Sequence, residues 1–168
     1  IIARLKKSNI KLPVLCLSYI RSILEEKGID TIYTESFLFS KGLVKKKSIE
    51  GIIIYGSIVC CDFENKLISE IKAIDRNIKI IVVGTYPTKF PDKFKNADYV
   101  IIGEPEDFFI QWNGNLSNLP SKEKNLISNN LKNLDNLPLP KYTMEYSKKF
   151  AYSPMLQRPT GFIEATRG

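Results

Sequence analysis

The chain has 168 residues, and 43% of them are hydrophobic, which is enough for one packed domain and too many for a disordered protein. Lys and Arg outnumber Asp and Glu by 25 to 18 for a net charge of +7, but the lysines are spread along the chain without a nucleic-acid motif. We therefore expect a solvated basic surface and no nucleic-acid partner. No apolar run approaches the roughly 20 residues that span a bilayer, so we expect a cytoplasmic protein without a membrane partner.

The sequence contains no histidine, which excludes a Ser-His-Asp triad, a histidine base and a histidine metal ligand within these residues. Cys16, Cys60 and Cys61 form no Cys-x-x-Cys pair and no disulfide framework. We interpret them as small buried residues in a reducing compartment. The chain itself is therefore expected to carry neither catalytic residues nor a metal site.

The first part of the chain predicts a helix followed by a strand. Residues 12–27 have apolar side chains at helical spacing, with a stripe through Leu15, Tyr19 and Ile23 that Leu17, Ile20 and Leu24 widen. Pro13 suits a first turn, and Gly28 is a typical helix stop. The β-branched run 29–34 predicts a strand, and residues 37–47 predict either a short helix or a loop.

Three apolar segments predict strands, and each is closed by a glycine: a continuous run at residues 51–55 that is typical of a strand buried on both faces, a second buried strand at residues 78–83 and a third strand at residues 99–102. A helix is expected over residues 62–74, with Asp62 as its N-cap or in its first turn. Its expected inner face is Phe63, Leu67, Ile71 and Ile74. Residues 91–96 predict a short helix or turn, and residues 107–112 begin another helix.

This alternation without hairpin signals predicts an α/β fold, a doubly wound (Rossmann- or flavodoxin-like) parallel sheet with helices on both faces. The α/β domain is expected to cover residues 1–112, with a first strand that is either missing or limited to residues 1–4. Residues 113–148, rich in Asn, Ser and Lys, predict a linker, whose Leu137-Pro138-Leu139-Pro140 run is extended. Residues 149–168 have no evident packing partner in the chain.

Ligands of open parallel sheets bind at the carboxyl ends of the strands. Three such ends are readable, at residues 56–59, 84–88 and 103–106, and each opens with glycine. Their candidate binding residues are Ser57, Ile58, Gly84, Thr85, Tyr86, Thr88, Gly103 and Glu104. Ordinary turn chemistry is the alternative for each loop, and none matches the fingerprints GxGxxG or GxxxxGK.

Glu104 and Glu106 could be read as paired carboxylates for acid–base work. We prefer a structural interpretation, in which both lie at the start of the following helix and its dipole stabilises them.

Several segments together resemble the cobalamin-binding domain at the front of many radical S-adenosylmethionine (radical SAM) enzymes. Residues 80–88 resemble a strand ending in Gly-Gly-x-x-Pro-Thr, and residues 98–106 resemble Asp-x-Val-x-x-Gly-Glu-Gly-Glu. Residues 134–140 resemble the Leu-Asp-x-Leu-Pro-x-Pro segment that leads into the radical SAM barrel of that family. Thr166-Arg167-Gly168 resembles the residues that precede its CxxxCxxC cluster loop. The helix that ends at Gly28 resembles that family's early helix.

The resemblance implies a cofactor-binding domain of a larger enzyme, a methyltransferase or a radical rearrangement or cyclase enzyme, with residues 149–168 entering the barrel. Cobalamin would lie at the candidate residues above without histidine ligation. The 4Fe-4S cluster, S-adenosylmethionine and the barrel, a partner in cis, would lie beyond residue 168, so this fragment alone is not expected to be catalytic. Thr85 and Pro105 replace glycines of the pattern and add bulk where the cofactor would approach. The Asp-x-His-x-x-Gly loop is absent.

The alternative is a non-catalytic flavodoxin-like or receiver-like module that binds a partner. A receiver needs a phosphoacceptor Asp after its third strand, where this chain has Ser57. That difference counts against the receiver.

Overall fold

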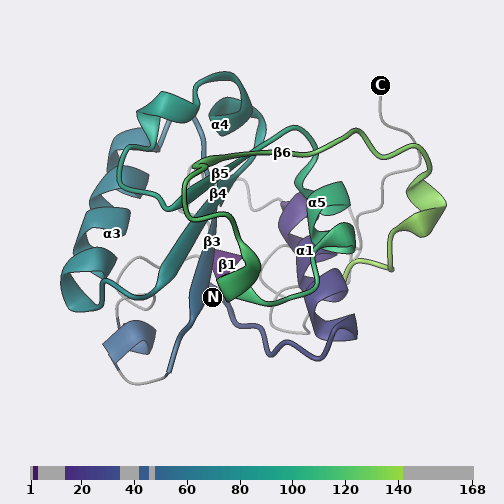
Figure 1. The fold of residues 1–168 in the computed structure, drawn as a ribbon, viewed down its shortest axis with the longest axis horizontal. Coiled ribbons are helices and arrows are strands. Elements are labelled where there is room, and N and C mark those ends of the chain that lie inside the picture. Colours follow the sequence, from purple (N-terminus) through teal and green to yellow (C-terminus); the bar gives the residue numbers. More distant parts are fainter. Residues whose placement is uncertain (1, 4–13, 35–41, 46–47, 142–168) are drawn as a thin grey trace, which may run out of the picture.

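The structure is a computed structural model, and it describes residues 2–3, 14–34, 42–45 and 48–141 (Figure 1). Six strands form one sheet in the order β2-β1-β3-β4-β5-β6, and every neighbouring pair is parallel. The strands are β1 (Ile2–Ala3), β2 (Tyr33–Thr34), β3 (Gly51–Tyr55), β4 (Lys79–Val83), β5 (Tyr99–Ile102) and β6 (Asn125–Ile127). The strand order reverses between β1 and β3, as in doubly wound folds of the flavodoxin type.

Helices cover both faces of this sheet (Figure 1). Helix α3 (Cys61–Ile74) lies on one face, and α1 (Leu15–Glu26) and α5 (Pro105–Gln111) lie on the other. The short helix α4 (Thr85–Lys89) follows β4, and residues 42–45 are also helical. Single 3-10 turns occur at Pro91–Lys93, Leu116–Asn118 and Leu134–Asn136. The predicted α/β class, a parallel sheet flanked by helices, is confirmed.

Alternate residues of the central strands build two separate cores. Ile52 and Ile54 of β3 face α3, whereas Ile53 faces α1 and α5. The same alternation divides Ile80 and Val82 from Ile81 and Val83 on β4. Because both faces are buried, these strands are apolar at every central position, which is the pattern from which they were predicted.

Helix α1 ends where the sequence predicts, because Lys27 is its C-cap and Gly28 follows with φ +76°. Tyr19 and Ile23 of the predicted stripe are buried, and so are Leu17, Ile20 and Leu24, which were expected to widen it. Leu15 is only partly buried and lies at the margin of this face. Residues 12 and 13, including the proposed first-turn proline, lie outside the described part of the chain.

Helix α3 confirms Asp62 in its first turn, and Cys60 is its N-cap. Leu67 and Ile71 are fully buried as expected, and Ile74 packs partly against the same core. The assignment of Phe63 to the inner face is wrong, since its side chain is 65% exposed. Glu64 occupies the buried position instead, because its carboxylate turns back toward the loop that follows β3.

Two elements were not predicted. Residues 85–89 form α4 rather than a loop, with Pro87 in the first turn, where its missing N–H costs no helical hydrogen bond. Asn125–Ile127 form β6, which pairs with β5 at the edge of the sheet. The expected linker at residues 113–148 is thus corrected, because part of it completes the sheet. Residues 142–168, including the expected barrel entry, lie outside the described residues.

The remaining boundaries differ by a few residues. Strand β2 is limited to two residues of the predicted run 29–34, and the first strand is the two-residue β1. Helix α5 starts at Pro105, a favourable first helical position, two residues earlier than expected. Leu137 is extended as predicted. Among the described residues, we find no helix with the length and hydrophobicity needed to cross a membrane.

Candidate functional site

The predicted site residues lie at the carboxyl edge of the sheet. They follow β3, β4 and β5, which are adjacent and parallel, so their loops emerge side by side near α4 (Figure 1). The strand order reverses between β1 and β3, and open sheets of this type bind ligands at such a point. Residues 4–13, which follow β1, lie outside the described residues.

The loop after β3 is organised by a buried carboxylate. Glu64 is fully buried, and its Oε2 accepts a hydrogen bond of 2.9 Å from the Ser57 backbone N–H. The Ser57 hydroxyl lies 3.4 Å from the other carboxylate oxygen and accepts from the Cys60 N–H at 3.3 Å. Ser57 therefore forms the internal hydrogen bonds of this loop.

Thr88 connects the loops after β4 and β5. Its hydroxyl donates to the Gly84 carbonyl oxygen at 2.9 Å and accepts from the Gly103 N–H at 3.2 Å. A hydroxyl has one hydrogen, so these two contacts use its donor and one of its acceptor positions. Thr88 thus holds two neighbouring loops together across the carboxyl edge.

Residues after β6 close the loop that follows β5. The Ser128 hydroxyl donates to the Glu104 carbonyl oxygen at 2.5 Å, and the Leu131 N–H donates to the Glu104 carboxylate at 2.6 Å. Glu104 is the N-cap residue of α5, and Glu106 lies in its first turn. This placement agrees with the interpretation of these two glutamates as residues of the helix start.

The glycines of this edge are required by contacts within the protein. A Cβ at Gly103, where φ is +107°, would lie 2.4 Å from the Ser128 carbonyl oxygen. A Cβ at Gly56 would lie 2.5 Å from Pro87, and one at Gly84, where φ is +124°, 3.1 Å from the Gly56 carbonyl oxygen. These close approaches fill the space that a ligand would need beside each glycine.

The most accessible part of the edge is largely apolar. Ile58 and Val59, in the turn after Ser57, are 70% and 74% exposed, and Phe63 in the first turn of α3 is 65% exposed. Thr85 is exposed at the start of α4, whereas Tyr86 is half-buried and packs on Phe90 with ring centroids 5.2 Å apart. A ligand at this edge would therefore meet apolar side chains and the Thr85 hydroxyl.

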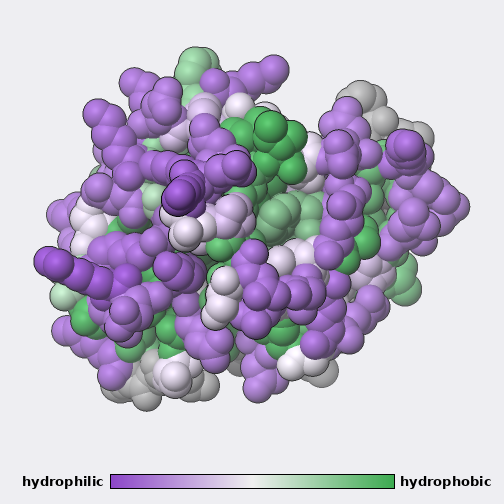
Figure 2. Space-filling view, viewed as in Figure 1, coloured by the Kyte–Doolittle hydropathy of each residue, from purple (hydrophilic) through white to green (hydrophobic). Residues whose placement is uncertain are grey.

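Apolar surface also occurs near β6. In Figure 2, apolar residues gather where β6 crosses the molecule in Figure 1, and polar residues cover much of the surface beside them. Ile127 of β6 is 83% exposed.

The cysteine at the start of α3 is not activated. Burial raises the pKa of the Cys61 thiol above its usual value of 9.0, and the nearby Glu64 and Asp62 carboxylates raise it further. The thiol is therefore protonated near neutral pH and is a poor nucleophile. No group of three or more Cys, Asp or Glu side chains in the described ranges is arranged to hold a metal ion.

A cavity of about 460 Å³ lies at the opposite, amino-terminal edge of the sheet, and no sequence pattern pointed to it. It opens between the end of α1, the start of β3 and the turn after α5. Its lining includes Ile29, Thr31, Glu50, Gly51, Trp112 and Leu116. Residues distant in the sequence form this cavity, so only the tertiary structure shows it.

The structure thus brings Gly84, Thr88, Gly103 and Glu104 together and places Ser57 and Ile58 beside the neighbouring strand end. The polar groups of Ser57, Thr88 and Glu104 bind other parts of the chain. No protein-family model, curated protein or solved structure matches this chain.

Proposed function

We propose that this chain is the N-terminal, cobalamin-binding-type domain of a radical SAM enzyme, a methyltransferase or a radical rearrangement or cyclase enzyme. One observation carries the proposal. Segments that resemble the family's loops follow adjacent parallel strands, and Thr88 joins two of them at the edge where open α/β sheets bind ligands.

Several residues expected to hold the cofactor do not fit that role. Ser57, Thr88 and Glu104 use polar groups internally, and protein atoms occupy the space beside Gly84 and Gly103. No buried side-chain nitrogen or oxygen among the described residues lacks a hydrogen-bond partner. We therefore assign no reaction step to a cofactor at this edge.

The exposed apolar side chains of this edge, unlike its polar groups, are available to contact a ligand. Ile58, Val59 and Phe63 are each more than 60% exposed, and burying a large apolar side chain contributes about 1.5–3 kcal/mol. A flat cofactor such as cobalamin, or the barrel in cis, would cover them. With no histidine in the sequence, this chain would leave the cobalt without a histidine ligand.

Titration with hydroxocobalamin tests the cofactor proposal. We expect the absorbance spectrum of hydroxocobalamin to change on adding the folded chain, with measurable binding heat. Ile58→Asp should weaken this binding at least tenfold. The control Ile127→Asp changes another exposed isoleucine, on β6, three strands from β3, and should leave binding unchanged. No binding by a folded sample would refute the cofactor proposal.

The same apolar side chains also favour a second candidate, a non-catalytic module that binds a protein partner. Reading the gene beyond residue 168 discriminates between the two. A CxxxCxxC motif directly downstream supports the radical SAM enzyme, and a reading frame without it supports the binding module.

A further inference from the structure

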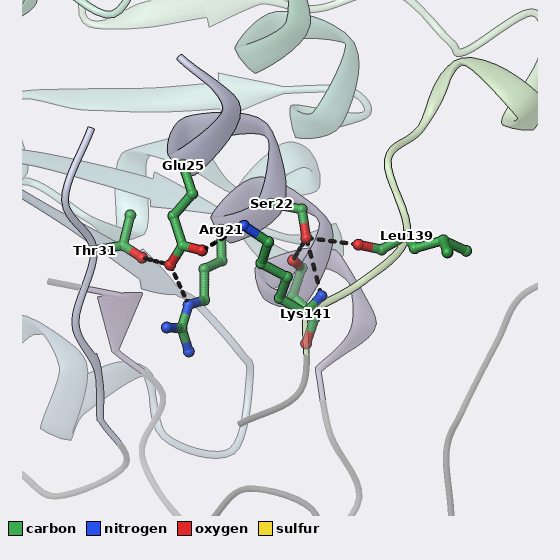
Figure 3. Close-up of polar contacts among 7 residues, drawn as sticks. Arg21, Ser22, Glu25, Thr31, Leu139 and Lys141 are labelled. Atoms are coloured by element: carbon green, nitrogen blue, oxygen red, sulfur yellow. Dashed lines mark hydrogen bonds and ion pairs between the residues drawn. The ribbon is translucent and has the colours of Figure 1, made fainter. Parts of the chain in front are cut away.

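The segment 137–141 lies on helix α1, more than 100 residues away in the sequence. Leu137 packs partly against the core that α1 and α5 share. Figure 3 shows the polar contacts that follow, where Ser22 and Glu25 of α1 meet Leu139 and Lys141. These two α1 residues are three positions apart and thus lie on one face of the helix.

The Ser22 hydroxyl forms two hydrogen bonds with this segment, one as donor and one as acceptor. Its Oγ donates to the Leu139 carbonyl oxygen at 2.8 Å and accepts from the Lys141 N–H at 2.9 Å. The Ser18 carbonyl of the same helix is farther away, at 3.2 Å, so the single hydroxyl hydrogen favours Leu139. Ser22 is only 1% exposed, and the loss of a buried partner leaves the other groups unsatisfied.

Glu25 adds the ionic part of the contact. Its Oε1 accepts hydrogen bonds from Arg21 Nε at 2.7 Å and Thr31 Oγ1 at 2.6 Å. Its Oε2 lies 3.0 Å from Lys141 Nζ. One carboxylate thus joins α1, the chain before β2 and the segment after the last 3-10 turn.

The composition of the segment suits this docking. Pro138 and Pro140 have no backbone N–H and fix φ, so the segment loses less conformational freedom when it is bound. The backbone groups of Leu139 and Lys141, which alternate with the prolines, are the ones that Ser22 bonds. An isolated surface ion pair would hold such a segment weakly, but here it accompanies a buried pair of hydrogen bonds.

We propose that Ser22 and Glu25 form a latch, a set of contacts that holds residues 137–141 on α1 and fixes the position of Lys141 on the α/β domain. The latch does not depend on the proposed function, because its contacts lie on α1, away from the candidate site.

Amide hydrogen exchange, measured by NMR on the whole labelled chain, tests the latch at Lys141. We expect the Lys141 amide to exchange more slowly than in a free peptide of the same sequence. Ser22→Ala should accelerate this exchange about fivefold or more, since it removes the acceptor. Glu25→Gln should accelerate it to a smaller extent. Tryptic cleavage after Lys141, relative to the exposed Lys132, should increase in both variants.

Two variants serve as matched controls. Ser69→Ala removes a serine hydroxyl of α3 that likewise bonds its own helix and a distant side chain, Asn96. Glu26→Gln changes the exposed neighbour of Glu25. Both should leave Lys141 exchange unchanged. If Ser22→Ala does not fold, Glu25→Gln decides, because that site is partly exposed. Exchange and cleavage at Lys141 that are unaffected in the folded latch variants would overturn the proposal.

Discussion

Substitution of Gly103 by alanine tests how tightly the loops of the carboxyl edge are closed. The new Cβ would lie 2.4 Å from the Ser128 carbonyl oxygen, a backbone atom that cannot move without shifting the chain after β6. The residue also has φ +107°, which side chains other than glycine rarely adopt. Two separate penalties therefore act at one position.

The size of the effect follows from these two terms. Backbone strain at such a φ costs about 1–3 kcal/mol, and overpacking costs about 1–3 kcal/mol more. We expect Gly103→Ala to lower the free energy of unfolding by about 3–5 kcal/mol. Gly28→Ala is the matched control, because Gly28 has φ +76° but a Cβ added there would have nothing within 4 Å. Gly28→Ala should lower the free energy of unfolding by only about 1–2 kcal/mol.

Urea unfolding followed by circular dichroism gives both free energies by linear extrapolation. The excess cost of Gly103→Ala over Gly28→Ala, about 2 kcal/mol, measures the contact with Ser128. Equal losses of unfolding free energy for the two variants would show that the chain after β6 does not pack closely against Gly103, and that the loops of the carboxyl edge are not closed.

Three further outcomes are expected. Thr88→Val removes the hydroxyl that bonds Gly84 and Gly103 and should lower the free energy of unfolding by about 1–3 kcal/mol. Thr88→Ser keeps a hydroxyl and should have a free energy of unfolding close to that of the wild type. Equal losses for the two variants in urea unfolding would contradict the role of the Thr88 hydroxyl. Glu64→Leu leaves the Ser57 N–H without its acceptor and should lower the free energy of unfolding, measured in the same way, by about 1–3 kcal/mol. Glu64→Gln keeps an oxygen acceptor and should lower it less. Burial opposes the charge of Glu25, but hydrogen bonds from Thr31, Arg21 and Lys141 outweigh it and lower its pKa from 4.5 to about 2. The stabilisation of the folded chain by the Glu25 carboxylate is therefore present above pH 4.5 and is lost as the pH falls toward 2. The urea midpoint of the wild type should thus decrease more between pH 5 and pH 3 than that of Glu25→Gln. Equal decreases in the two proteins would contradict this role of Glu25.

The central strands could be predicted from the sequence because their burial leaves a local pattern. Residues 52–54 and 80–83 are apolar and buried on both faces of the sheet, and this pattern is visible in a short stretch of sequence. Strand β6 leaves no such pattern, since only Leu126 of its three residues is buried. Its strand conformation depends on pairing with β5, which a local pattern does not encode.

The candidate site was predictable in position but not in its contacts. Glycines after buried strands located the loops at the carboxyl edge. The partners of Thr88 and Glu104 lie 15 and 27 residues away, so their internal hydrogen bonds could not be read from the sequence. Glu64, whose buried carboxylate accepts a hydrogen bond from the Ser57 N–H, was also not identified from the sequence.

The most direct test of the account is a hydrogen-exchange footprint of hydroxocobalamin on the chain. The proposal predicts slower exchange in residues 57–60 and 84–88 at the carboxyl edge, with no change around the cavity at Ile29, Thr31 and Gly51. Protection at that cavity instead, or no protection at either edge of the sheet, would contradict it.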